Sequence, residues 1–335
     1  MSAREASVSE QRCLDDLRNV VMENELLRVS LLADYGCDIV ELRFKPCNLD
    51  LLWHSPQGIR RRRHFVPCSP SERPFLDYYH GGWQELFPHA SSAATYAGAQ
   101  LGFHGEVWGL PWDYEILKNG PAEAAVRFWV RTVRMPFYLE RTVSLRAHDN
   151  VLRFRELAVN EGRVPLRFMW GHHPAFGPPF LDSASMLDSD ARSIQVGSAL
   201  ESWPVGRDGI DHRQLVPQPE AAGEVMKYLS DFQEGWVALT QPKINLGIGL
   251  VFDPEVFSYV WLWQEFEYTK DYPWFGRTYV LGMEPQSSLP EAHQSGGRLL
   301  QLEAGGRLET ELLAVVYRGA RPQHISKDGQ VSSVV

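Results

Sequence analysis

The sequence is poor in cysteine and contains no long apolar run. The four cysteines among its 335 residues, Cys13, Cys37, Cys47 and Cys68, lack the CxxC spacing of a zinc or redox site. We interpret them as reduced thiols in a cytoplasmic protein. No apolar stretch is long enough to form a membrane-spanning helix. Residues 1–18 are polar and mixed in charge, unlike a signal peptide. We therefore expect no membrane partner.

Positive charge is also scarce. The formal net charge of -9 argues against nucleic acid and anionic membranes as partners, because both favour a surplus of Lys and Arg. The one basic run is Arg60-Arg61-Arg62-Arg63. Such a run is commonly a solvated loop, but it could also clamp an anionic group on a substrate. Nucleotide-binding loops and the GxSxG elbow are absent as well.

Strand signals dominate what is present, and helical periodicity is scarce. Residues 10–21 are the best helical candidate and fit a strand equally well. Alternating apolar, β-branched and aromatic residues predict an antiparallel meander over three runs, 125–133, 138–145 and 151–159. Residues 299–302 and 308–317, on either side of Gly305-Gly306, are typical of a hairpin that closes the sheet.

The length and a hydrophobic content of 44% fit one large all-β sandwich. We predict a single domain over residues 1–321, followed by a flexible tail over 322–335. The stretch 182–224 is rich in Ser, Asp, Gly and Pro, which indicates long loops with short elements. The sequence leaves open whether the protein is a monomer or a homodimer.

Three short segments carry the candidate chemistry. They contain His104 in GFHGE, His172 and His173 in GHHPAF, and Glu284 in GMEPQ. An acid and a base on rigid strands suffice for proton transfer. Because neighbouring residues of a strand point to opposite faces, only one of His172 and His173 can enter a given cleft. Both could instead be hydrogen-bonded structural histidines.

A metal site must be considered, since two histidines and a carboxylate form a known ligand set. Here His104, His173 and Glu284 come from remote segments, without a local HxH or HExxH signature. We therefore expect neither a metal nor another cofactor.

Aromatic residues gather around the same segments. The chain has 11 tryptophans, and Tyr259, Trp261 and Trp263 share one face of a predicted strand. Such rings form either a wall against the apolar face of a sugar or a layer of the sandwich core.

Five motifs in order resemble the aldose 1-epimerases of the galactose mutarotase-like superfamily. These motifs are Ala33–Asp38 with Leu51–Trp53, Gly81–Pro88, Phe103–Gly105, His173–Phe176 and Leu281–Gln286. The resemblance implies a β-supersandwich with few short helices. It also implies an isomerase that interconverts the α and β anomers of an aldose without a cofactor. Glu284 would be the general base, His173 the general acid, and His104 would assist or bind the substrate.

Some positions depart from the family pattern. An Arg usually follows the Phe-Pro segment, but residues 89–94 read HASSAA, and Ala175 stands where an aromatic is common. Gln84, Glu85 and His89 are candidates for the missing contacts. Three tryptophans beside the motifs complete the predicted substrate-binding set: Trp108, Trp170 and Trp263.

The substrate is therefore an unidentified sugar, with an anionic one left open. Two other functions remain possible on this fold. A glycoside hydrolase or lyase would use Glu284 with Glu106 or Glu85 as a carboxylate pair. A noncatalytic carbohydrate-binding protein would keep the cleft without turnover.

Overall fold

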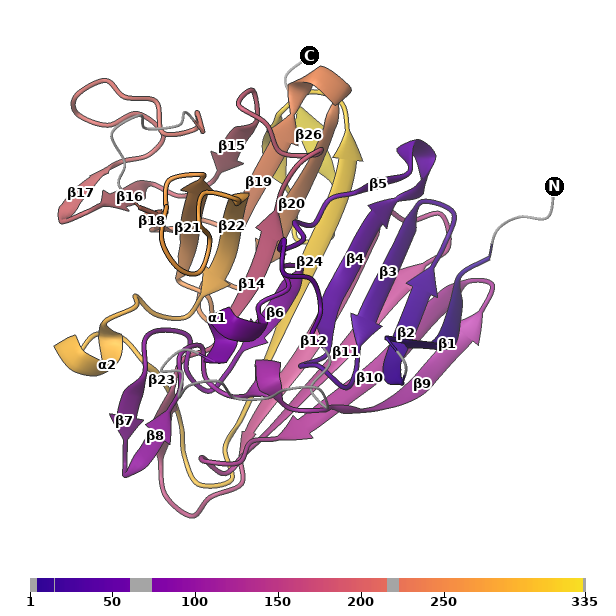
Figure 1. The fold of residues 1–335 in the computed structure, drawn as a ribbon, viewed down its shortest axis with the longest axis vertical. Helices are drawn as coiled ribbons and strands as arrows, with labels where there is room; N and C mark the ends of the chain where they lie inside the picture. Colours follow the sequence, from indigo (N-terminus) through magenta and orange to yellow (C-terminus); the bar gives the residue numbers. More distant parts are fainter. Residues whose placement is uncertain (1–4, 15, 61–73, 216–222, 334–335) are drawn as a thin grey trace.

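Two large antiparallel β-sheets stack face to face and form the body of the protein (Figure 1). The computed structural model describes residues 5–14, 16–60, 74–215 and 223–333. The first sheet has 12 strands and the second has 8. The expectation of one large all-β sandwich is confirmed.

The strands of the first sheet, in spatial order, are β1 (Ser7–Cys13), β2 (Leu17–Glu23), β3 (Leu27–Leu32), β4 (Asp38–Phe44), β6 (Trp83–Leu86), β14 (Gly171–Phe176), β22 (Tyr279–Gln286), β21 (Tyr259–Phe266), β18 (Val225–Ser230), β16 (Ser193–Val196) and β17 (Ala199–Ser202), with β5 (Leu49–Asp50) beside β4. Those of the second sheet are β15 (Met186–Ser189), β19 (Trp236–Gln241), β20 (Leu246–Phe252), β24 (Arg307–Arg318), β12 (Val151–Asn160), β11 (Phe137–Arg146), β10 (Glu123–Arg131) and β9 (Asp113–Gly120).

Three small pairs complete the strands: β13 (Leu166–Phe168) with β23 (Leu300–Leu302), β7 (Ala94–Tyr96) with β8 (Ala99–Leu101), and β25 (Pro322–Ile325) with β26 (Val331–Ser333). The short helices are α1 (Pro74–Tyr78), α2 (Ala292–Ser295) and the 3₁₀ turns η1 (Lys45–Cys47), η3 (Val107–Gly109) and η4 (Pro242–Ile244).

The core lies between the inner faces of the two sheets. Strand alternation turns Leu31 and Ile39 of the first sheet and Phe128 and Phe154 of the second into one buried cluster. Full burial of one such side chain contributes about 1.5–3 kcal/mol. The predicted meander is confirmed, because β10 pairs with β11 and β11 with β12.

Residues 10–21, which fit a helix and a strand equally well, form most of the β1–β2 hairpin, so the strand interpretation is confirmed. The hairpin predicted near the C-terminus is wrong. Residues 299–302 and 308–317 do not pair with each other. β23 joins β13, while both edges of β24 are occupied by β12 and β20 in the middle of the second sheet.

The expected flexible tail is ordered up to residue 333. β25 and β26 form a hairpin on the outer face of the second sheet, where Ile325 is buried beside Val151 and Val315. A Cβ on Gly249 would lie 2.3 Å from the Ile325 side chain. The glycine therefore leaves the space that Ile325 fills.

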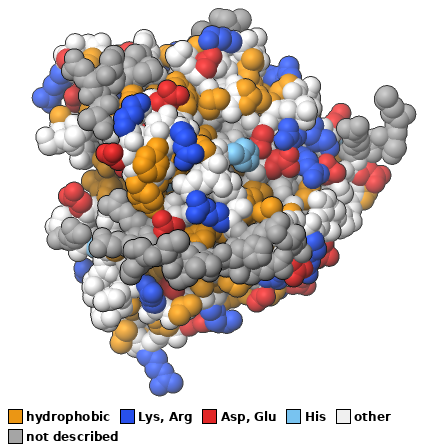
Figure 2. Space-filling view, viewed as in Figure 1, with side chains coloured by type: hydrophobic (Ala, Val, Ile, Leu, Met, Phe, Trp, Pro, Cys, Tyr) orange, Lys and Arg blue, Asp and Glu red, His pale blue; other side chains and the backbone are white. Residues whose placement is uncertain are grey.

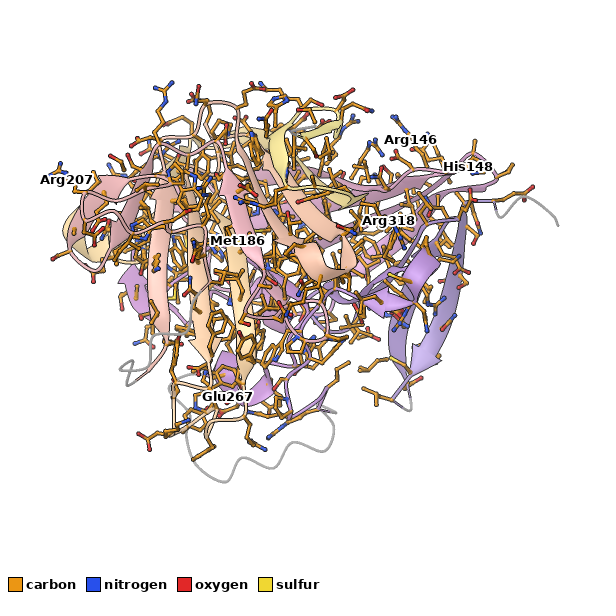
Figure 3. The ribbon with its side chains drawn as sticks, turned by 90° about the horizontal axis from the view of Figure 1, so that it is seen from above. Arg146, His148, Met186, Arg207, Glu267 and Arg318 are labelled. Carbon is orange, nitrogen blue, oxygen red and sulfur yellow. The ribbon has the colours of Figure 1, made fainter. Side chains whose placement is uncertain are left out.

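The outer face of the first sheet carries α1 and the long loops. Figure 3 places Glu267, the first residue after β21, on the opposite side of the molecule from Arg146, His148 and Arg318. Arg146 and Arg318 end strands β11 and β24 of the second sheet, and His148 lies in the turn that follows β11. In the described part of the chain, no helix is long and apolar enough to span a membrane.

Candidate active site

Two neighbouring strands of the first sheet place His173 and Glu284 side by side. The ladder between β14 and β22 pairs Gly171 with Gln286 and Ala175 with Gly282. This register sets His173 opposite Glu284, with both side chains on the outer face. The His173 Nε2 atom lies 3.5 Å from Glu284 Oε1, and both residues are buried. The sheet itself therefore forms the predicted acid–base pair.

Two motif glycines make room for this pair. A Cβ on Gly282 would lie 2.4 Å from Glu284 Oε1, so the carboxylate occupies the space above the bare glycine. Likewise, a Cβ on Gly171 would overlap the amide of Gln286. That amide donates to Glu284 Oε2 and to the His172 carbonyl, both at 3.4 Å. Gln286 thus ties the candidate base to the backbone of β14.

His173 has a second partner on its other ring nitrogen. The Tyr79 hydroxyl, just after α1, lies 3.2 Å from His173 Nδ1. A histidine held at Nδ1 presents Nε2 to the reacting groups, because the contact fixes the orientation of the ring. Tyr79 also stacks on Phe75, at 4.8 Å between ring centroids. α1 therefore both covers and orients His173.

His104 reaches the site from a strained turn. His104 and Gly105 both have positive φ, at 63° and 75°. A Cβ on Gly105 would approach the carbonyl oxygens of Phe87 and His89 to 2.6 Å. His104 Nδ1 is 2.8 Å from the Ala90 carbonyl, which can only accept, so Nδ1 carries a proton. The ring centroids of His104 and His173 are 5.3 Å apart.

These groups line a cavity of about 520 Å³ on the outer face, here called the outer cavity. The described lining residues come mainly from α1, from the loops around residues 91–104 and 269–274, and from β14, β18, β21 and β22. They are Phe75, Leu76, Tyr79, Ser91, Ser92, Phe103, His104, His173, Gly223, Glu224, Met226, Tyr228, Trp261, Trp263, Thr269, Tyr272, Pro273, Trp274, Glu284 and Pro290. The predicted aromatic wall of Trp261 and Trp263 thus faces a cavity and also belongs to a buried aromatic cluster.

Burial shifts the pKa values of Glu284 and His173 in opposite directions. It raises the pKa of Glu284 well above the ordinary value of 4.5, with a smaller contribution from the negative charge of Glu224. It lowers the pKa of His173 from 6.5 to about 4. These opposite shifts favour the neutral form of the pair, with its single proton on the carboxyl group.

Several predicted substrate-binding residues point away from the cavity. Glu85 and Trp170 lie on the inner side of the first sheet, where the Trp170 indole N–H donates to Glu85. Strand alternation turns both side chains toward the second sheet, so the structure does not bring these predicted binding residues to the outer cavity. For the same reason, Glu85 cannot act with Glu284 as a carboxylate pair.

His172 belongs to this inner group. The side chains of Glu85, Arg141, Glu156 and His172 are at most 1% exposed. Arg141 bridges the two carboxylates, with Nε 3.1 Å from Glu156. The Trp83 indole can only donate, so its 3.2 Å contact makes His172 Nδ1 an acceptor.

Glu85, Glu156 and His172 are also close enough together to act as metal ligands. The guanidinium of Arg141 already supplies the positive charge between the carboxylates. These residues therefore do not fit a metal site.

The other predicted residues lie near the outer cavity without lining it. Gln84 donates to Asp38 at 3.0 Å, and His89 contacts the Ser92 carbonyl at 2.5 Å. Trp108 packs behind Phe75, with ring centroids 5.2 Å apart. Glu106 accepts from the backbone N–H of Val133 and of Arg134 instead of facing Glu284.

The basic run is described only at its start. Arg60 is exposed and donates to Gln57 at 3.0 Å. Arg61 to Arg63 lie outside the described residues. The prediction of an anion clamp stays a prediction.

Sequence analysis missed Tyr79 and Glu224. Tyr79 lies just before the Gly81-Gly82 motif, and this closeness could have marked it as a candidate site residue. Glu224 accepts a 2.9 Å hydrogen bond from the Trp263 indole and lines the outer cavity. Glu224 immediately precedes β18, and no local motif marks the pairing of β18 with β21 that brings it to the cavity.

Solved structures with the same fold define the class. Slr1438 from Synechocystis sp. PCC 6803 is 19% identical, with 92% of this chain and 98% of that chain covered and a TM-score of 0.66. A galactose mutarotase-like protein from Clostridium acetobutylicum is 13% identical, with 94% and 99% covered and a TM-score of 0.64. A galactose mutarotase related enzyme from Lactobacillus acidophilus is 15% identical, with 89% and 97% covered and a TM-score of 0.59.

These likenesses, together with the two stacked sheets, define a galactose mutarotase-like fold. Within it, the chain belongs to DUF4432, a family described as a domain of unknown function, which matches residues 17–315. No curated protein matches the sequence.

Proposed function

We propose that this protein interconverts the α and β anomers of an aldose or aldose derivative. The observation that carries the proposal is the pair formed by His173 and Glu284, 3.5 Å apart at the wall of the outer cavity. Anomer exchange needs one group that takes a proton from O1 and one that gives a proton to the ring oxygen. A carboxylate and an imidazole on adjacent rigid strands supply both.

The reaction runs from the minor, ionised form of the pair. The Glu284 carboxylate takes the proton from O1, and the His173 imidazolium gives its Nε2 proton to the ring oxygen as the C1–O5 bond breaks. The C1–C2 bond then rotates. Ring closure on the other face returns both protons, so the enzyme ends the cycle unchanged.

Burial makes each group more reactive. A carboxylate with a raised pKa is a stronger base, and an imidazolium with a lowered pKa is a stronger acid. His104 supports the reaction from the cavity wall. Its Nδ1–H is held by the Ala90 carbonyl, and the ring lines the outer cavity, where a bound sugar can contact it.

The fold adds support, since one structural relative is described as a galactose mutarotase related enzyme. Exchange NMR between the anomers of a sugar, with and without the protein, tests the proposal. Faster exchange that disappears in Glu284→Gln supports it. Unchanged exchange over a broad sugar panel would reject it.

A second candidate function is glycan cleavage, and one observation favours it. Glu224 and Glu284 both line the outer cavity, and a hydrolase needs two carboxylates. Release of new reducing ends from oligosaccharides would favour this candidate. A binding protein without turnover would instead give sugar-dependent thermal stabilisation and no chemistry.

A further inference from the structure

The outer cavity has one polar end and a large aromatic remainder. His104, His173 and Glu284 gather at the polar end, close to Ser91. Directly beside this end, three tryptophans line the cavity. Trp261 pairs with Glu284 across β21 and β22, the Trp263 ring centroid lies 5.8 Å from that of His173, and Trp274 packs in the same cluster. Trp263 and Trp274 have ring centroids 5.7 Å apart. A sugar with its anomeric carbon at the polar end must therefore lay the rest of its ring against aromatic surface.

The polar atoms of this wall are largely engaged within the protein. The Trp261 indole N–H donates to the Ser288 carbonyl at 3.0 Å, and the Trp263 indole N–H donates to Glu224. Thr269 donates its hydroxyl to Glu265. A sugar hydroxyl directed at the faces of these rings would lose its water there without gaining a partner, which costs binding free energy.

The acidic residues of the described lining are two glutamates, and Glu224 is the one whose negative charge acts on Glu284. Glu224 and Glu284 line the outer cavity, and no Lys or Arg does so within residues 5–14, 16–60, 74–215 and 223–333. Glu224 already raises the pKa of Glu284 by repulsion. A phosphate or sulfonate held here would meet the same repulsion.

Figure 2, drawn from the side of α1, β14 and β22, shows hydrophobic side chains exposed near the centre of this face. Tyr272, which lines the outer cavity, is 51% exposed. The aromatic surface thus extends from the interior of the cavity to its rim.

From these observations we infer that the substrate is an uncharged aldose in which at least one hydroxyl is absent or capped by an apolar group. The polar end of the cavity recognises the hemiacetal, and the aromatic wall accepts the apolar side of the sugar. This inference rests on the proposed function and names the substrate class for it.

The test compares matched sugars in anomer-exchange NMR. The probes are glucose and galactose, their 2-deoxy and 6-deoxy counterparts, and their 6-phosphates. We expect kcat/KM for at least one deoxy sugar to exceed that of its parent about tenfold or more, as for discrimination at an apolar pocket. The 6-phosphates should be slower than the parents.

Other outcomes separate this inference from the proposed function. Exchange of the parent hexoses at least as fast as that of every deoxy sugar would overturn the inference and leave anomer exchange intact. Preference for a 6-phosphate would also overturn it. No exchange of any probe, with sugar binding still detected, would remove the proposed function itself.

A variant of the wall gives a second readout. Met226 lines the outer cavity and pairs with Trp263 across β18 and β21. Met226→Gln adds a hydrogen-bonding group of similar size. It should therefore reduce the ratio of kcat/KM for the deoxy sugar to kcat/KM for its parent. Met226→Leu keeps the wall apolar and should preserve that preference. Equal preferences in both variants would contradict an apolar subsite, provided that both melt like the parent protein.

Discussion

His173 stands directly opposite Glu284 across the β14–β22 ladder, with Nε2 and Oε1 3.5 Å apart. Burial moves their pKa values in opposite directions, upward for the carboxyl and down to about 4 for the imidazole. In water the histidine has the higher pKa of the two, but in this pair the glutamate does. The pair titrates as a unit, and its behaviour belongs to both residues.

This reversal predicts a broad plateau in the pH dependence of anomer exchange. Below about pH 4, His173 is protonated as well as Glu284. The pair then holds two protons and has no base left, so kcat falls. Above the raised pKa of Glu284, the pair loses its proton and no acid remains. Exchange NMR across this range measures the profile. An acid limb centred at the ordinary histidine value of 6.5 would contradict the account.

Tyr79→Phe tests the role of the phenol hydroxyl on His173. The variant keeps the ring that stacks on Phe75 but removes the 3.2 Å contact with Nδ1. We expect kcat to fall about 10- to 100-fold through lost orientation, with KM nearly unchanged. Tyr317→Phe, which removes a buried hydroxyl bonded to Thr240, is the matched control. Equal kcat in the two variants would show that Tyr79 does not position His173.

Arg141→Met tests the inner charged group. The change would leave Glu85 and Glu156 buried without their shared cation, so the free energy of unfolding should fall by about 3–5 kcal/mol. Urea denaturation measures this loss. The triple variant that also carries Glu85→Gln and Glu156→Gln should recover much of it. A loss below about 1 kcal/mol would mean that the carboxylates need no such partner.

The sequence predicted the sandwich and the three catalytic candidates because these features depend on local patterns. Alternation marks β10, β11 and β12, and the motif glycines mark the turns and ladders that carry His104, His173 and Glu284. Neighbouring residues of a strand point to opposite faces, and accordingly only His173 of the two adjacent histidines lines the cavity.

The remaining site depends on long-range packing. Tyr79 reaches His173 only because α1 folds over β14. Glu85 has the residue type of a catalytic acid, but its position within β6 turns it toward Arg141. No local pattern records which of the two sheet faces will hold the cavity.

Lys227 gives a test of stability outside the site. Its side chain is 7% exposed on the inner side of β18, and burial lowers the pKa of its ammonium group. Lys227→Met should therefore raise the free energy of unfolding at neutral pH by about 1 kcal/mol.

The stability that Lys227→Met gains over the parent protein should depend on pH. A lysine whose folded pKa is lowered destabilises the fold below that pKa, and the penalty disappears as pH rises toward the unfolded value of 10.5. Thermal melts of both proteins from neutral to alkaline pH measure the trend, with the exposed Lys327→Met as control. A gain that grows with pH would contradict burial as the cause.

The most direct test of the central claim is two-dimensional exchange NMR on an aldose panel with the parent protein and Glu284→Gln. The account predicts α/β cross-peaks that the parent protein enhances and the variant does not, while line broadening shows that the variant still binds sugar. General acid–base catalysis of this kind contributes about 10²–10⁴-fold, so the loss should be plain. Enhancement that is equal in both proteins would contradict the assignment of Glu284 as the base.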